Sequence, residues 1–114
     1  MRNTIHLSSF QIISQALKPE LDKLSEAKKR YRVEGGRFLI FVYKEFPPKI
    51  SCTIPDRDNV IRKPMKELKK LFQKAVINYH PDKQDEEKYG IKWKILCEEI
   101  TKYLSAFYEI TKGL

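Results

Sequence analysis

The chain places a histidine and an aspartate on either side of one proline, as His80-Pro81-Asp82. Proline restricts the backbone at its own position and at the residue before it, so the loop presents both side chains in a limited set of arrangements. Asp82 is an acceptor for charge-assisted hydrogen bonds from a partner's arginine, and such bonds are stronger than neutral ones. The tripeptide therefore favours a recognition loop.

An enzymatic or metal-binding role for His80 is not expected. A general base needs a nucleophile within hydrogen-bond reach, and no serine or cysteine is placed near His80 in the sequence. A zinc site needs about four ligands, whereas the other soft ligands are only His6, Cys52 and Cys97, without a CxxC pair. The chain has four glycines and no phosphate-cradling loop. We therefore predict a non-enzyme without cofactor or metal.

A basic amphipathic helix is predicted directly before the loop. From Pro64 to Tyr79, apolar residues recur at steps of three and four, which is the helical period. Residues 61–83 hold seven basic and two acidic side chains, more than half of the net charge of +8. Such a face steers a protein towards an acidic surface. The basic residues that we expect to contact a partner are Lys66, Lys69, Lys70 and Lys74, with Lys83 after the loop.

Two further helical regions are predicted around this segment. Apolar spacing predicts a helix that starts at Ser8 or Ser9, that Pro19 kinks or divides into two, and that Gly35-Gly36 ends. A last helix is predicted from Asp85 or Glu86 to Lys112, with acidic residues at its N-terminus.

A small β-hairpin is predicted between these helical regions. Residues 37–43 form a short run rich in aromatic and β-branched side chains, which is typical of a strand. Residues 50–54 alternate between apolar and polar types, as a second strand would. Because an isolated two-stranded hairpin is marginal in water, we expect it to lie against the helices.

The segment from Lys66 to Lys83, with its Tyr-His-Pro-Asp-Lys ending, resembles helix II and the following loop of the J domain, which defines the DnaJ-type co-chaperones. The resemblance covers roughly residues 64–110 and is greatest to the auxilin subgroup. It implies a mainly α fold, with a J-domain-like antiparallel helical hairpin beside the N-terminal helix and the small β-hairpin. Residues 1–60 would then form the N-terminal extension, and residues 61–114 would contain J-domain-like helices II and III.

In the J-domain family, the basic helix docks on the ATPase of a DnaK-type heat-shock chaperone, and the loop couples docking to faster ATP hydrolysis. The resemblance implies the same function here. The residues that it assigns to chaperone binding are His80, Pro81, Asp82, Lys66, Lys69, Lys70, Lys74, Tyr79 and Lys83. The family's helix I should lie near residues 53–57, where this chain has Thr-Ile-Pro-Asp-Arg. A degenerate J-like adaptor without chaperone activation is therefore the alternative.

The basic charge also fits a nucleic-acid-binding domain, but we do not expect one because no nucleic-acid-binding motif occurs. No apolar run is long enough to span a membrane. We expect a monomeric module, a piece of a longer protein, whose residues 1–60 are available to a client or adaptor protein. Two cysteines without a disulfide pattern favour free thiols in a reducing compartment, the cytoplasm or the nucleus.

Overall fold

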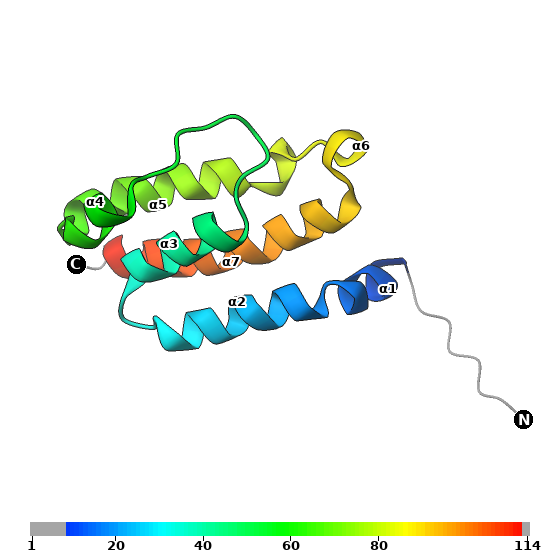
Figure 1. The fold of residues 1–114 in the computed structure, drawn as a ribbon, viewed down its shortest axis with the longest axis horizontal. Helices are drawn as coiled ribbons and strands as arrows, with labels where there is room; N and C mark the ends of the chain where they lie inside the picture. Colours follow the sequence, from blue (N-terminus) through cyan, green and yellow to red (C-terminus); the bar gives the residue numbers. More distant parts are fainter. Residues whose placement is uncertain (1–8, 113–114) are drawn as a thin grey trace, which may run out of the picture.

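The computed structural model describes residues 9–112, and these residues form helices and loops without strands. The helices are α1 (Ser9–Ala16), α2 (Lys18–Arg30), α3 (Gly35–Glu45), α4 (Arg57–Arg62), α5 (Met65–Tyr79), the 3-10 turn η1 (Pro81–Lys83), α6 (Glu86–Tyr89) and α7 (Ile91–Lys112). Figure 1 shows α5 and α7 side by side, with α2 along α7 and the short α4 at the end where α5 begins. The prediction of a mainly helical fold is confirmed.

The core is centred on aromatic rings from three helices. Phe38 of α3 stacks on Phe107 of α7 with ring centroids 4.7 Å apart, and Phe72 of α5 lies 6.0 Å from Phe107. All three rings are buried, and α2 adds the buried Leu24 and Ala27. Offset-stacked rings add about 0.5–1.5 kcal/mol per pair to the free energy gained by burial. The hairpin of α5 and α7 is therefore covered by α2 and α3.

The predicted β-hairpin is wrong. The proposed first strand, residues 37–43, lies inside helix α3, and the proposed second strand, residues 50–54, lies in an irregular loop. Phe38, Leu39, Val42 and Tyr43 of α3 are buried. The two residues between these pairs, Ile40 and Phe41, are half-buried against the core. A helix that is covered on more than one side shows no polar face over a short run, so its sequence is indistinguishable from a buried strand.

Gly35 does not end the N-terminal helix as predicted but begins α3. A Cβ atom at Gly35 would lie 3.1 Å from Cζ of Phe72 and 3.2 Å from Cδ1 of Phe107. These distances are shorter than ordinary carbon contacts, so glycine allows α3 to approach the aromatic core closely. Gly35 is thus a packing feature, whereas the preceding helix α2 already ends at Arg30.

Two other helix boundaries depend on single residues. Pro19 lies in the first turn of α2, so the N-terminal helical region is divided in two, which was one of the two predicted outcomes. The predicted continuous last helix is interrupted at Gly90, whose φ of 92° only glycine adopts readily, and α6 and α7 lie on either side. Asp85 caps α6 by accepting hydrogen bonds from the backbone N–H groups of Glu87 and Lys88.

Within residues 9–112, no helix is both long and apolar enough to cross a bilayer.

The burial of two weak acids predicts lower stability at alkaline pH. Burial raises the pKa of the Cys97 thiol from its ordinary 9.0 to about 12, and it raises the pKa of the Tyr79 hydroxyl well above its usual range. The folded chain therefore keeps these protons to higher pH than the unfolded chain, and stability falls as the pH rises from about 9 towards 12. Urea unfolding at about pH 8 and about pH 10 should show a lower midpoint at the higher pH.

Cys97→Ala provides the control for this pH dependence. The variant is expected to be less stable than the wild type at neutral pH, because the substitution leaves a small cavity. Its free energy of unfolding should fall less between about pH 8 and about pH 10, because it lacks the thiol whose pKa is raised by burial. An unfolding midpoint that is constant or rises over this interval would contradict the prediction.

Candidate functional site

The basic face of α5 is exposed along its length. Lys66, Lys70 and Lys74 are exposed, and Lys69 is half-buried. None of these four side chains forms an ion pair with an acidic residue of the described part of the chain. The acidic residue in the first turn of α5, Glu67, forms an ion pair of 3.6 Å with Lys63, which precedes the helix. The face therefore presents uncompensated positive charge to an approaching partner.

The His-Pro-Asp loop directly follows the C-terminal end of α5 as the 3-10 turn η1. Nδ1 of His80 accepts a hydrogen bond of 3.1 Å from the backbone N–H of Asp82 and lies 3.8 Å from the Asp82 carboxylate. The Asp82 side chain is 87% exposed and that of His80 43% exposed. Lys83 is exposed beside them, and Pro81 is half-buried. The loop thus presents an acceptor carboxylate to solvent next to a fixed imidazole.

A buried glutamine fixes this loop to the hairpin. Nε2 of Gln84 donates to the carbonyl oxygens of Asn78 and His80, at 3.0 and 3.1 Å. Its Oε1 accepts a hydrogen bond of 2.8 Å from Nε1 of Trp93 in α7. Gln84 is only 3% exposed. A satisfied buried polar network rigidifies its surroundings, so the Gln84–Trp93 bridge sets the loop's position relative to both long helices.

Tyr79 belongs to the same support and has no exposed surface. Its hydroxyl donates a hydrogen bond of 2.5 Å to the carbonyl oxygen of Phe46, at the end of α3. The carbonyl oxygen of Tyr79 accepts from the Thr101 hydroxyl at 3.1 Å. Of the residues that the resemblance assigns to chaperone binding, Tyr79 is therefore placed to position the loop and not to touch a partner.

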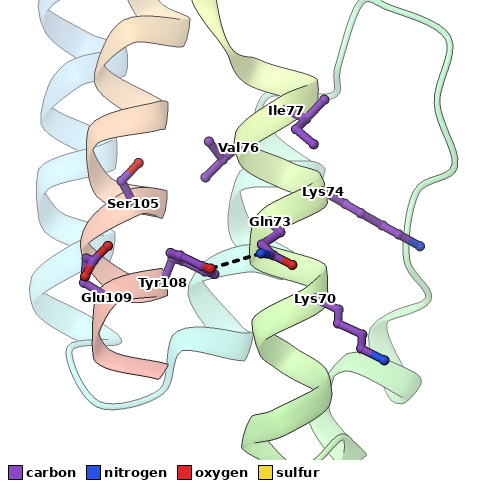
Figure 2. A pocket seen from close by; sticks show the side chains of 8 residues that line it. All are labelled: Lys70, Gln73, Lys74, Val76, Ile77, Ser105, Tyr108 and Glu109. Carbon is purple, nitrogen blue, oxygen red and sulfur yellow. Dashed lines mark hydrogen bonds between the residues drawn. The ribbon is translucent and has the colours of Figure 1, made fainter. Parts of the chain in front are cut away.

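An open groove runs beside the basic face, between α5 and α7 (Figure 2). Its volume is about 750 Å³, and its lining includes Val76 and the 52% exposed Ile77. The Gln73 side chain donates a hydrogen bond of 3.0 Å to the Tyr108 hydroxyl across it. Figure 2 shows the Lys70 and Lys74 side chains extending from α5 on the flank away from α7. Apolar surface and positive charge therefore lie next to each other on one helix.

Sequence reasoning found the basic helix and the loop, but it missed the groove and the role of Gln84. Gln84 and Trp93 lie nine positions apart with α6 between them, and no periodicity connects them. Trp93 itself has little exposed surface. The residue is 8% exposed, and its ring lies beside the ring of Tyr79. The Lys49 ammonium group lies over the Trp93 ring, 5.0 Å from the ring centroid.

Among residues 9–112, no group of three or more histidine, cysteine, aspartate or glutamate side chains is arranged to hold a metal ion. Cys52 and Cys97 are both free thiols.

Comparisons of the chain with protein-family models, with curated proteins and with solved structures gave no significant match.

Proposed function

We propose that this protein is a J-domain-type co-chaperone module that binds a DnaK-type heat-shock chaperone and stimulates its ATPase. The observation that carries the proposal is the continuity of one surface. The unpaired lysines of α5 lead along the helix to a loop whose His80 and Asp82 side chains are exposed and whose backbone is bridged to both long helices. To couple docking to catalysis by a second protein, a module needs a charged surface that steers the two proteins together and a rigid loop that is held in a defined position.

In this proposal each part has a separate task. Lys66, Lys70 and Lys74 steer the chaperone's acidic surface towards α5, and the exposed Ile77 provides an apolar contact beside them. Asp82 accepts charge-assisted hydrogen bonds from the chaperone. The protein itself hydrolyses no ATP. The two free thiols suit the reducing cytoplasm or nucleus, where we place the activity.

A J-like adaptor that binds a chaperone without activating it is the second candidate. The observation that favours it lies before α4, where residues 53–56 are irregular although the family's helix I is expected there. Helices α2 and α3 cover the hairpin of α5 and α7 instead. The two candidates differ in one measurement, because an adaptor binds the chaperone and leaves its rate of single-turnover ATP hydrolysis unchanged.

Charge reversal on α5 tests the docking surface. Lys74→Glu is expected to weaken stimulation of a DnaK-type ATPase by about 3- to 10-fold at low salt, because a rim charge of the wrong sign slows association. The deficit should shrink as the salt concentration rises and screens the charges. Single-turnover ATP hydrolysis, measured over a range of co-chaperone concentrations, reports the change.

Lys29→Glu is the matched control, because Lys29 is an equally exposed lysine on α2 and the substitution changes the net charge by the same amount. It should leave stimulation unchanged. Equal losses in the two variants would mean that only net charge matters and would contradict docking on α5. A wild-type protein that neither binds nor stimulates any DnaK-type chaperone would overturn the proposed function.

A further inference from the structure

A second basic site lies on helices that the proposed docking surface does not use. A hollow of about 480 Å³ is formed by the end of α2, the partly exposed face of α3, and α4. Four of its lining residues are cationic: Arg30, Arg37, Lys44 and Arg57. Its size is within the range of about 300–1,000 Å³ that is usual for ligand pockets.

Most of this positive charge has no acidic partner. Arg37 forms an ion pair of 2.6 Å with Glu34. Glu45, the acidic residue of the lining, lies 4.0 Å from Lys23, which is outside the hollow. Arg30, Lys44 and Arg57 form no ion pair with a described acidic residue, although they lie on three different helices. Positive charges that lie close together without acidic partners repel one another, and a bound anion would relieve this repulsion.

The hollow also has an apolar part. Ile40 and Phe41 of α3 are half-buried in its lining, and Ile61 of α4 is 41% exposed there. A site that combines arginine guanidinium groups with an apolar surface fits a ligand that carries carboxylates next to a large apolar side chain. Arginine is suited to this task because its planar fork binds a carboxylate through two hydrogen bonds.

The apolar part favours a peptide over a nucleic acid. The Phe41 ring already contacts the rings of Phe38 and Phe46, with centroids 6.4 and 6.1 Å apart. This half-buried ring therefore offers little open face for stacking bases, which single-stranded nucleic acids need. The other aromatic ring of the lining, Tyr31, already has the Arg30 guanidinium group 5.9 Å from its centroid. A nucleic acid carries a phosphate at every nucleotide, so its backbone would be repelled by Glu45 in the lining, whereas a peptide can place its carboxylates on the arginines and an uncharged residue beside Glu45.

We infer that the hollow between α2, α3 and α4 binds a short acidic peptide segment of a partner protein, with carboxylates on the arginines and an apolar side chain against Ile40 and Ile61. The site goes beyond the proposed co-chaperone function and does not depend on it. It shares no helix with the α5 and α7 surface, so a partner held here would leave the His-Pro-Asp loop accessible.

Fluorescence anisotropy with a labelled peptide, in which glutamates flank a Leu-Phe pair, tests the inference on the full chain. Arg57→Glu is expected to weaken binding by about tenfold or more, because it places a carboxylate where the ligand's carboxylate would lie. Lys74→Glu, which makes the same change of net charge on α5, should leave peptide binding unchanged. Ile61→Ser should weaken binding of this peptide but not of one in which serines replace the Leu-Phe pair.

Three results would overturn the inference. The first is that the wild type and Arg57→Glu bind the peptide equally well. The second is that Arg57→Glu and Lys74→Glu lose the same amount of peptide affinity. The third is that duplex RNA displaces the labelled peptide at a lower concentration than unlabelled peptide does. Arg57 is exposed at the start of α4, and circular dichroism confirms that each variant is folded before binding is compared. Chaperone ATPase stimulation should be unchanged in Arg57→Glu, so failure of this site is distinguishable from failure of the proposed function.

Discussion

His80→Gln is expected to abolish stimulation of a DnaK-type ATPase while leaving the protein folded. The imidazole is 43% exposed, and its Nδ1 receives one hydrogen bond, from the backbone N–H of Asp82. A glutamine side chain is flexible and does not reproduce the ring's position beside the Asp82 carboxylate. If the loop couples docking to hydrolysis, stimulation should fall by at least about tenfold, which corresponds to about 1.4 kcal/mol of lost transition-state stabilisation.

The same substitution should hardly change the stability of the fold. The loop backbone is held by bonds that do not involve the imidazole: the carbonyl oxygen of His80 accepts from Gln84 Nε2 and from the Lys83 backbone N–H. The substitution removes only the exposed hydrogen bond that His80 Nδ1 accepts from the Asp82 N–H, so the expected loss in the free energy of unfolding is about 1 kcal/mol or less. Thermal unfolding checks this expectation, and binding to the chaperone should persist through the lysines of α5.

Glu87→Gln is the matched control for the loop variant. Glu87 is exposed on α6 at the same end of the hairpin, and the change also introduces a glutamine. It should stimulate as well as the wild type does. Unchanged stimulation by His80→Gln would refute the co-chaperone proposal, whereas binding without stimulation by the wild type would favour the adaptor.

Gln84→Ala is expected to cost about 2–4 kcal/mol in the free energy of unfolding. It removes the partner of the Trp93 indole N–H and of the Asn78 carbonyl oxygen, and each buried polar group left unsatisfied costs about 1–3 kcal/mol. The His80 carbonyl oxygen loses one of its two donors and keeps the Lys83 backbone N–H. Urea unfolding measures the loss. Stimulation should fall as well, because the loop loses its bridge to α7 while His80 and Asp82 remain.

Gln73→Ala is the control, since it makes the same chemical change at an exposed position. Gln73 donates an exposed hydrogen bond to the Tyr108 hydroxyl, at the surface of the groove, so the expected change is within about 1 kcal/mol. Comparable losses of stability in the two variants would contradict the role assigned to Gln84. A Gln84→Ala protein that is destabilised but stimulates at the wild-type rate would show that the bridge supports the fold alone.

The sequence predicted the regions in which local chemistry agrees with the final structure. Helix α5 is amphipathic, with one face in the core and the other in water, so its period of 3.6 residues is visible from Met65 to Tyr79. Pro81 fixes the end of that helix and the start of the loop, because proline disfavours a helical residue before it. The basic lysines can be recognised without a structure, since charge is a property of the residue type and their spacing of three and four residues places them on the helix.

Residues 35–45 show where this reasoning fails. Six consecutive residues, Phe38 to Tyr43, are apolar, because α3 packs against α2, α4, α5 and α7 and is therefore enclosed on several sides. The propensity of aromatic and β-branched residues for strands is a weak preference that tertiary packing overrides. In the folded chain these residues lie between other helices, and Gly35 allows the start of α3 to approach Phe72 and Phe107 closely.

By itself, the sequence determined a mainly helical chain with a basic helix that leads into His80-Pro81-Asp82. Those features depend on residues close together along the chain, whose physical preferences act locally. The tertiary structure decided the rest: the bridge from Gln84 to Trp93, the groove between α5 and α7, and the meeting of Arg30, Lys44 and Arg57 around one hollow. Each of these joins residues on different helices, and only the packing of the core brings those helices together.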